Sequence, residues 1–503
     1  MSKVLMIQGT MSSAGKSLIT AGLCRVFARK GYRVAPFKSQ NMSLNSFITD
    51  DGLEMGRAQV MQAEAAGIRP QAAMNPILLK PANDVASQVI VNGKVRANLS
   101  AREYFRYKKS LVPDIIAAFR SLEKQADLIL VEGAGSPAEI NLKQDDIVNM
   151  GLAKLLGSNV LLVGDIDRGG VFAQLYGTAA LLEPDEQARL RGLIINKFRG
   201  DKSILDPGIA KIERRTGIPV LGVIPYLHLS LDDEDSLSAR LETPAPGSAA
   251  EAARQTALDI AVIRLPHISN FTDFDVFDEF ADVSVRFADD AGALGRPDLV
   301  CLPGSKNTLG DLAWLKQSGL ADAVRRLARD GVPIIGICGG YQMLGQSVSD
   351  PERVETPEGS PNEATGLGLL PAVTVLAGTK TTRQTRGVIP RLTGTFAGMS
   401  GKPFEGYEIH MGVTTDETKA PAVFLSSGNV LGTYIHGLFD KKESAEALVN
   451  LLYEKKKKTR APEREPILDY REFRESQYDR LADALEKHMD IDAVQKLFVD
   501  AAI

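Results

Sequence analysis

The sequence predicts an α/β protein with two doubly wound domains, each built on a mostly parallel sheet, and a helical C-terminal segment. Short apolar runs alternate with helical patterns in both halves of the chain, which is typical of parallel sheets covered by helices on both faces. A stretch rich in Pro, Ala, Gly and Ser at residues 243–256 separates the two halves. A length of 503 residues accommodates two or three domains of ordinary size.

The composition is that of a globular protein, with 44% hydrophobic and 24% charged residues. The formal net charge of −4 gives no attraction to nucleic acid or to anionic membranes, so we expect neither as a partner. The chain has no signal-peptide pattern and no apolar run of the roughly 20 residues that cross a bilayer. Its three cysteines are too scattered for a disulfide framework. These features predict a cytoplasmic protein and leave its oligomeric state open.

The first predicted domain covers residues 1–240. It opens with a strand over residues 4–7, a helix over 16–29 and a short strand over 32–36. Four more apolar runs predict buried strands, at residues 128–131, 160–163, 193–195 and 220–224.

The second predicted domain covers residues 258–447, after a linker at 241–257. Its buried strands are expected at residues 260–263, 299–302, 332–337 and 430–434. Residues 350–363, rich in Pro, Glu, Ser and Gly, predict a surface loop. Residues 448–503 predict a helical C-terminal segment in which we identify no chemistry.

A glycine-rich turn between the first strand and the first helix indicates a phosphate-binding loop. Backbone N–H groups of such a turn and of the helix N-terminus face an anion, while Lys16 reaches the outer phosphates. The Ser17 hydroxyl is placed to ligate Mg²⁺. The first glycine lies one residue farther from Gly-Lys-Ser than in the common phosphate loop. The residues expected to bind ATP here are Gly9, Thr10, Ser13, Ala14, Gly15, Lys16 and Ser17.

Two acidic residues are candidates to complete the Mg²⁺ site. Glu132 ends the strand at residues 128–131, so its carboxylate is expected at the carboxyl edge of the sheet, where ligands bind in open α/β folds. Asp51, in a Thr-Asp-Asp-Gly turn, is the second candidate; the alternative is a solvated turn aspartate. Asn196, at the end of the strand at 193–195, is expected to contact the adenine base.

Cys338 has the sequence context of a catalytic nucleophile. It follows the apolar strand at 332–337, precedes two glycines and opens a helical pattern. This order predicts a sharp strand-to-helix elbow that presents a side chain at the sheet edge. The helix N-terminus favours the thiolate, which is the attacking form. Cys24 and Cys301 are interpreted as small buried core residues.

His436 is the expected general base for Cys338, because it follows the apolar strand at 430–434 and so also lies at a sheet edge. His410 is the alternative base. An oxyanion would be stabilised by backbone N–H groups of Gly304, at the end of another strand, and Gly339, next to the nucleophile.

Several motifs resemble known families. Residues 331–345 and 430–439 resemble a class I glutamine amidotransferase domain, and the phosphate loop with its extra residue resembles the dethiobiotin-synthetase family of ATPases. Both halves in this order are similar to the cobyrinic-acid amidating enzymes of cobalamin biosynthesis, and this similarity runs through most of the chain. The longer motifs that carry it are residues 36–42, 56–59, 131–141, 164–170 and 302–308.

The resemblance implies an enzyme that uses ATP, Mg²⁺ and glutamine to amidate a corrin polycarboxylate. One branch of the family amidates the b, d, e and g carboxylates of adenosylcobyrinic acid a,c-diamide, and the alternative is the sister branch that amidates a and c. More remote alternatives are a partition-type ATPase switch without amide chemistry and a stand-alone glutaminase or cysteine hydrolase. The resemblance also implies that Cys338 and His436 are nucleophile and base. Other class I amidotransferases have a glutamate two residues after the histidine, but here that position is Leu438. We therefore expect His436 to work without an acidic partner at that position.

Overall fold

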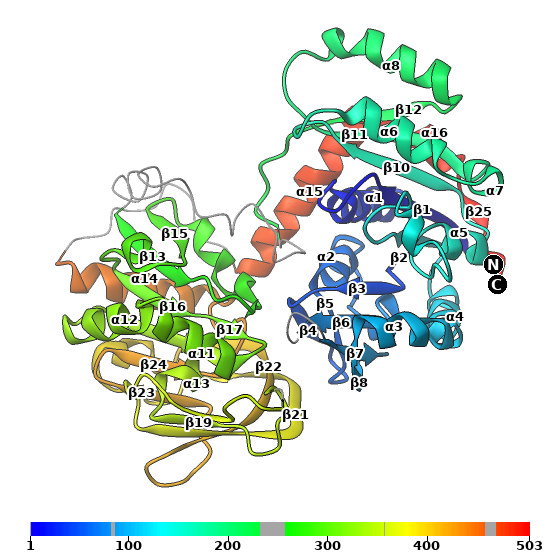
Figure 1. The fold of residues 1–503 in the computed structure, drawn as a ribbon. Helices are drawn as coiled ribbons and strands as arrows, with labels where there is room; N and C mark the ends of the chain where they lie inside the picture. Colours follow the sequence, from blue (N-terminus) through cyan, green and yellow to red (C-terminus); the bar gives the residue numbers. More distant parts are fainter. Residues whose placement is uncertain (1, 82–85, 232–256, 357, 458–468) are drawn as a thin grey trace.

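The computed structural model describes residues 2–81, 86–231, 257–356, 358–457 and 469–503. Two α/β bodies lie side by side, and each contains a mostly parallel sheet covered by helices (Figure 1). The predicted fold class is confirmed. Residues 241–256 of the predicted linker lie outside the described residues.

The sheet of the N-terminal half has the strand order β12-β11-β10-β1-β9-β2, and these six strands are parallel. All six strands were expected from the sequence. Their bounds are β1 (Lys3–Gly9), β2 (Val34–Phe37), β9 (Leu128–Glu132), β10 (Val160–Asp165), β11 (Leu190–Phe198) and β12 (Val220–Pro225). The helices of this half are α1 (Lys16–Arg29), α2 (Arg57–Ala65), α3 (Ala101–Tyr107), α4 (Val112–Glu123), α5 (Met150–Leu156), α6 (Val171–Ala180), α7 (Pro184–Gln187) and α8 (Lys202–Thr216).

Between β2 and β9 the chain forms a small sheet and a hairpin that the sequence did not reveal. The sheet has the order β3-β6-β7-β8, and the hairpin pairs β4 with β5. The strands β3, β4 and β5 have only three residues each, and the others lack a clear periodic pattern, so sequence periodicity does not mark them. Their bounds are β3 (Gln40–Met42), β4 (Ser46–Ile48), β5 (Glu54–Gly56), β6 (Ile77–Pro81), β7 (Ala86–Val91) and β8 (Lys94–Ser100).

The sheet of the C-terminal half has the order β15-β13-β16-β18-β24-β23, with only the edge strand β23 antiparallel. A second sheet, β20-β19-β21-β22, extends from it. The strands are β13 (Leu258–Ile263), β14 (Ile268–Ser269), β15 (Val283–Ala288), β16 (Leu299–Leu302), β17 (Gly304–Ser305), β18 (Ile334–Ile337), β19 (Ser347–Ser349), β20 (Glu363–Thr365), β21 (Ala372–Val388), β22 (Pro403–Asp416), β23 (Phe424–Ser427) and β24 (Val430–Thr433). The helices are α10 (Ala291–Leu294), α11 (Thr308–Gln317), α12 (Leu320–Arg329), α13 (Gly339–Leu344) and α14 (Lys442–Lys455), with a 3₁₀ segment η5 (Phe271–Glu279).

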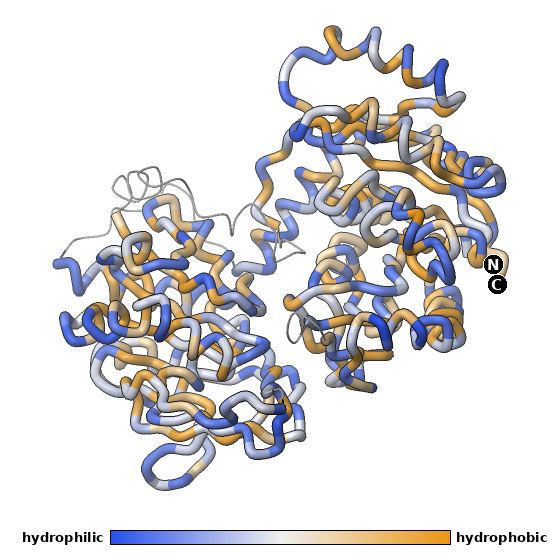
Figure 2. Tube along the Cα trace, viewed as in Figure 1, coloured by the Kyte–Doolittle hydropathy of each residue, from blue (hydrophilic) through white to orange (hydrophobic). Residues whose placement is uncertain are grey.

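Apolar residues run along the central strands of both sheets (Figure 2). The C-terminal half has one core, whereas the N-terminal half has a core on each face of its sheet. Among the described helices, none combines the length and the apolar character that crossing a bilayer requires.

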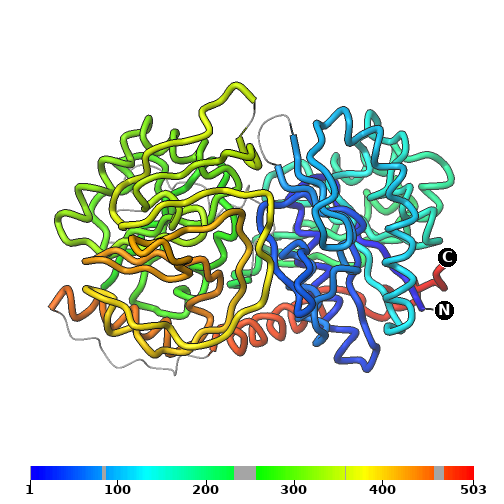
Figure 3. Tube along the Cα trace, turned by 90° about the horizontal axis from the view of Figure 1, so that it is seen from below, coloured from blue at the N-terminus to red at the C-terminus, as the bar shows by residue number. Residues whose placement is uncertain are grey.

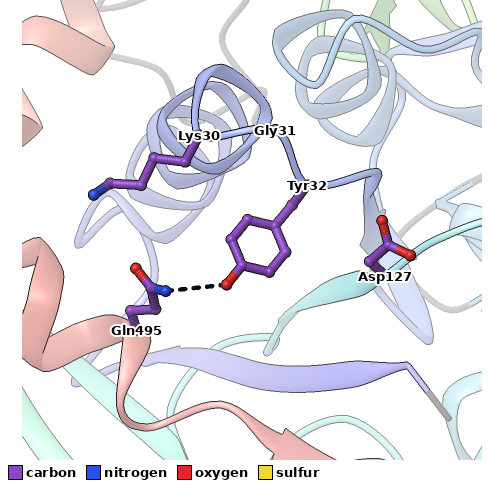
Figure 4. Close-up of a pocket in the computed structure, with 5 residues that line it drawn as sticks. All are labelled: Lys30, Gly31, Tyr32, Asp127 and Gln495. Atoms are coloured by element: carbon purple, nitrogen blue, oxygen red, sulfur yellow. Dashed lines mark hydrogen bonds between the residues drawn. The ribbon is translucent and has the colours of Figure 1, made fainter.

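The C-terminal segment returns to the N-terminal half (Figure 3). Helix α15 (Tyr470–His488) begins against the C-terminal half, where the Tyr470 N–H donates to the Asp440 carbonyl, and then packs Leu481 and Leu485 into the core beside α1. Helix α16 (Ile491–Gln495) follows, and the Gln495 amide donates to the Tyr32 hydroxyl at 3.0 Å (Figure 4). Residues 448–503 were predicted to be helical, and this prediction omitted the last element, β25 (Val499–Asp500), which pairs antiparallel with β1.

The predicted surface loop at 350–363 is only partly exposed. Asp350 is fully buried and accepts the backbone N–H groups of Val354, Glu355 and Thr356. The Glu355 carboxylate in turn accepts the N–H of Thr308, the first residue of α11. The acidic residues that suggested a surface loop therefore also hold this segment against the domain by hydrogen bonds.

Candidate functional sites

The phosphate loop has the expected place between β1 and α1. Gly15 precedes α1 with φ of 94°, a left-handed conformation that favours glycine. The Lys16 ammonium folds back over the loop and donates to the carbonyls of Met11 and Gly135, both at 3.1 Å. A Cβ at Gly9 would lie 3.0 Å from the Lys16 side chain, so the first glycine makes room for the lysine.

Glu132 is the centre of a buried polar cluster beside this loop. Its Oε1 accepts the Ser17 hydroxyl at 2.8 Å and the Lys38 ammonium at 3.0 Å, while Oε2 accepts the Gln62 amide at 2.5 Å. The Glu132 side chain is fully buried and Lys38 nearly so. The sequence analysis did not identify Lys38 as a candidate site residue. It lies within the motif at residues 36–42 and directly follows β2.

The Glu132 cluster brings together two of the three predicted metal ligands, Ser17 and Glu132. Hydroxyl and carboxylate oxygens are the donors that Mg²⁺ prefers, so this pair fits the ion. Asp51 lies in the turn between β4 and β5, and its carboxylate accepts the Thr49 hydroxyl. No cluster of three or more His, Cys, Asp or Glu side chains suited to a metal occurs in the described part of the chain.

The remaining phosphate-loop candidates are held by hydrogen bonds from other elements. The Asn196 amide donates to the Ala14 carbonyl at 2.9 Å, which supports the loop from β11. The Thr10 hydroxyl donates to Gln174, and the carbonyl of Ser13 accepts the Lys197 ammonium at 2.8 Å. Adenine contact by Asn196 stays a prediction.

Cys338 sits at a strained elbow between β18 and α13. Its φ of 52° and ψ of −110° are unusual for a residue with a side chain, and such strain is typical of catalytic elbows. Only glycine fits at the next two positions, because a Cβ at Gly339 would lie 2.7 Å from the Ser305 nitrogen and one at Gly340 2.0 Å from the Leu302 carbonyl oxygen. The geometry agrees with the elbow expected from the sequence.

His436 is fully buried at the end of β24 and has an acidic partner that the sequence did not reveal. Its Nδ1 lies 2.7 Å from Asp273 Oδ2, and Asp273 Oδ1 accepts the Gly437 N–H at 2.9 Å. Burial by itself would lower the pKa of His436, but the Asp273 carboxylate and Cys338 raise it to about 10. The ring is therefore an imidazolium at neutral pH. Its Nε2 has no hydrogen-bond partner among the described residues.

Position 438 holds a buried leucine, as the sequence states, and the carboxylate comes instead from η5. Asp273 is 163 residues from His436 in the chain, and no local pattern marks it. Asn270, three residues before it, has a left-handed φ of 52° just before η5, but this angle is visible only in the structure.

His410, the alternative base, makes different contacts. Its Nδ1 lies 3.1 Å from the Gly412 carbonyl and its Nε2 3.4 Å from Glu408, while the ring stacks on Tyr434 at 3.8 Å. It lines the pocket in front of Cys338 but has no carboxylate partner as close as that of His436.

Gly304 and Gly339, the predicted oxyanion donors, approach the cysteine–histidine pair. A Cβ at Gly304 would lie 3.3 Å from Cε1 of His436, and Gly339 is the first residue of α13, directly after Cys338. Both backbones are therefore beside the reacting groups.

The pocket in front of Cys338 has a volume of about 30 Å³ and is built by both halves of the chain. Lys80 comes from β6 of the N-terminal half, whereas Lys306 and Lys380 come from the C-terminal half. Glu54 of the β4–β5 hairpin joins two of these lysines: Oε1 accepts Lys80 at 2.8 Å and Oε2 accepts Lys380 at 2.6 Å. Burial by itself would raise the pKa of Glu54, but the two lysines lower it strongly.

The same hairpin touches the residues around His436. The Ser46 N–H donates to Asn270 Oδ1 at 3.0 Å, and the Ser46 carbonyl accepts the Tyr407 hydroxyl at 3.1 Å. Tyr407 stacks on the His436 ring with centroids 5.3 Å apart. The N-terminal half thus contacts two residues next to Asp273 and His436, namely Asn270 and Tyr407.

Two family matches correspond to the two halves. The CobQ/CobB/MinD/ParA nucleotide binding domain family matches residues 5–236, and the CobB/CobQ-like glutamine amidotransferase domain family matches residues 259–444. Together with the phosphate loop and the cysteine elbow, these matches define an ATP-dependent amidating enzyme of the glutamine amidotransferase class.

Similar proteins extend the match over the whole chain. The chain is 49% identical to the cobyric acid synthase of Lachnoclostridium phytofermentans over 99% of both chains, and 49% identical to that of Ruminiclostridium cellulolyticum over 99% of this chain and 97% of the relative. It is 50% identical to that of Listeria innocua over 98% and 96% of the two chains. The chain belongs to the cobyric acid synthase family.

Proposed function

We propose that the protein catalyses the ATP- and glutamine-dependent amidation of the b, d, e and g carboxylates of adenosylcobyrinic acid a,c-diamide. The observation that carries this proposal is the identity of about half of all residues with proteins named cobyric acid synthase, over nearly the full chain. These relatives are named cobyric acid synthase, so they do not favour the sister reaction at the a and c carboxylates. A cytoplasmic reaction, where ATP and glutamine are available, fits this chemistry.

In the C-terminal half, Cys338 attacks the side-chain amide carbon of glutamine and forms a thioester. The His436 imidazolium gives its Nε2 proton to the departing ammonia and then takes a proton from the water that hydrolyses the thioester. Asp273 orients the ring through Nδ1 and stabilises its positive charge. Backbone N–H groups of Gly304 and Gly339 stabilise the oxyanion.

In the N-terminal half, Lys16 and the backbone N–H groups of the loop hold the phosphates of ATP. Ser17 and Glu132 would hold Mg²⁺, which neutralises the charge that develops on the phosphates. A corrin carboxylate accepts the terminal phosphoryl group and becomes an acyl phosphate. Ammonia from the other half then displaces phosphate and leaves the amide.

The proposal is tested by incubating the protein with ATP, glutamine and adenosylcobyrinic acid a,c-diamide and following the products by mass spectrometry. We expect four successive amidations in the wild type. Lys16→Ala should form no amide but still hydrolyse glutamine, because Lys16 acts only in phosphoryl transfer. Amidation restricted to cobyrinic acid at a and c would favour the sister reaction, and amide formation by Lys16→Ala would contradict the role of the phosphate loop.

A further inference from the structure

A second pocket, of about 240 Å³, lies in the N-terminal half between the small sheet, helix α3 and the segment that follows β9. It is separate from the pocket at Cys338, with which it shares no lining residue. Apolar side chains from several elements form much of its wall. They are Met42, Leu79, Leu99, Tyr104, Phe105 and Leu142.

The mouth of this pocket exposes apolar side chains. Met42 is 55% exposed, Leu142 47% and Phe105 36%, and all three line the pocket. Ile140, in the same 3₁₀ turn as Leu142, is 59% exposed. Exposed large apolar residues scattered singly need no explanation, but a group of them around one pocket indicates a surface that a ligand covers.

One end of the pocket is formed by the segment after β9, which contacts Lys16 of the phosphate loop. Ala134 and Ser136 line it, and the carbonyl of Gly135 between them accepts the Lys16 ammonium at 3.1 Å. A group that enters the pocket this far therefore lies beside the lysine that we assign to phosphoryl transfer.

Asn149, which is nearly fully buried, adds an acceptor at the same end. Its amide N–H donates to the Ala134 carbonyl at 2.6 Å, but its Oδ1 has no hydrogen-bond partner among the described residues. A buried acceptor without a partner is costly and commonly marks a ligand contact. Glu139, also in the lining, offers a second acceptor.

Lys108 provides positive charge in the wall. Its ammonium donates to the Gln144 carbonyl at 3.1 Å and lies 4.2 Å from the centroid of the Phe105 ring. Asp146, the nearby carboxylate in the lining, accepts the backbone N–H groups of Val148, Asn149 and Gly151. The pocket thus combines an apolar wall with a cation and with acceptors for amide N–H groups.

We propose that this pocket binds one edge of the corrin macrocycle and presents a peripheral carboxylate near Gly135, whose carbonyl accepts the ammonium of Lys16 from the phosphate loop. The assignment rests on the proposed function. A corrin has apolar ring faces and a rim that carries both carboxylates and carboxamides, which matches the apolar wall, Lys108 and the acceptors of Asn149 and Glu139. A pocket of this volume holds an edge rather than the whole ring, so the substrate can present different carboxylates in turn by rebinding.

The test compares Leu142→Asp with Ile204→Asp in the full-length protein. Both residues are exposed aliphatic side chains of the N-terminal half, but Ile204 lies on α8 and does not line the pocket. Binding of cobyrinic acid a,c-diamide is measured by equilibrium dialysis, read by the visible absorption of the corrin. ATP binding and glutamine hydrolysis are measured on the same samples.

We expect Leu142→Asp to weaken corrin binding at least tenfold, with ATP binding and glutamine hydrolysis unchanged, and Ile204→Asp to behave as the wild type. Equal corrin binding by the wild type and Leu142→Asp would overturn the pocket assignment alone. A wild-type protein that neither binds nor amidates the corrin would overturn the proposed function and this assignment with it.

Discussion

At the scale of single residues, the chemistry that we propose for the C-terminal half uses three side chains from three separate segments. Cys338 comes from a strained elbow, His436 from the end of a strand, and Asp273 from a 3₁₀ turn earlier in the chain. The close contact between Asp273 and His436 keeps the ring charged at neutral pH, although burial by itself opposes the charge. A charged ring has a proton ready for the departing ammonia.

Cys338→Ala should separate the two reactions of the protein. Glutamine-dependent amidation should fall by about 10³-fold or more, because the variant lacks the thiol that we assign as the nucleophile. High ammonium salt should restore ATP-dependent amidation, because the phosphate loop and Glu132 are untouched. The measurement compares product formed from glutamine and from ammonium chloride, in wild type and variant. Continued use of glutamine would show that Cys338 is not the nucleophile.

Asp273→Asn should reduce glutamine hydrolysis by about 10²-fold or more, because the ring loses its orienting carboxylate. Asp273 raises the pKa of His436, so in the wild type the charged ring is present at neutral pH and is lost as pH rises through about 10. Without Asp273 this loss should occur at lower pH, which moves the alkaline limb of the pH profile of hydrolysis downward. Asp278→Asn, an exposed carboxylate of the same turn, is the control. An unmoved alkaline limb in Asp273→Asn would refute the pairing.

At the scale of elements, the β4–β5 hairpin is the main link between the halves around the active cysteine. It contributes Glu54 to a buried ion-pair cluster with Lys80 and Lys380, and Ser46 to the contacts beside His436. The following helix α2 places Gln62 on Glu132 of the phosphate site. One continuous segment, residues 46–62, therefore contacts both candidate sites.

Glu54→Gln should uncouple the halves. The substitution leaves two buried lysines without a carboxylate, and breaking such a pair costs about 3 kcal/mol or more of unfolding free energy. We expect more glutamate formed per amide, since ammonia should escape between poorly joined halves. Asp50→Asn, which breaks the exposed Arg69–Asp50 pair of the same hairpin, should change the unfolding free energy by less than about 1 kcal/mol. A wild-type ratio of glutamate to amide in Glu54→Gln would argue against a coupling role for the cluster.

At the scale of the whole molecule, the long helix of the C-terminal segment connects the two bodies. Helix α15 starts in the core of the C-terminal half with Tyr470 and ends in the core beside α1 with Leu485. Ion pairs between Arg25 or Arg29 and Asp479 line the same contact. Strand β25 then closes the chain against β1.

Leu485→Ala should destabilise the N-terminal half by about 2–5 kcal/mol, because a fully buried leucine is removed from the contact with α1. Thermal unfolding should show an earlier transition for that half, while glutamine hydrolysis at low temperature stays near wild type. Lys487→Ala, on the exposed side of the same helix, should leave the transition in place. Equal unfolding curves for the two variants would mean that α15 contributes little to the N-terminal core.

The sequence by itself determined the features whose cause is local. The loop from Gly9 to Ser17 and the elbow at Cys338 can be predicted because neighbouring glycines, an apolar strand before and a helix after dictate one backbone path. The same local alternation predicted the two sheets and their principal strands. The resemblance in motifs also pointed to the family that the chain-long relatives show.

Only the tertiary structure decided which distant side chains meet. Asp273 and Lys80 carry no local signal, and the motif that contains Lys38 does not reveal its partner. A carboxylate or ammonium in a turn or short strand is ordinary until packing buries it beside an opposite charge. The pairing of β25 with β1 could not be predicted either. The two strands lie at opposite ends of the chain, so their pairing depends on shape and burial rather than on sequence neighbours. Backbone geometry is set by adjacent residues, whereas the partners of charged groups are set by the complete fold.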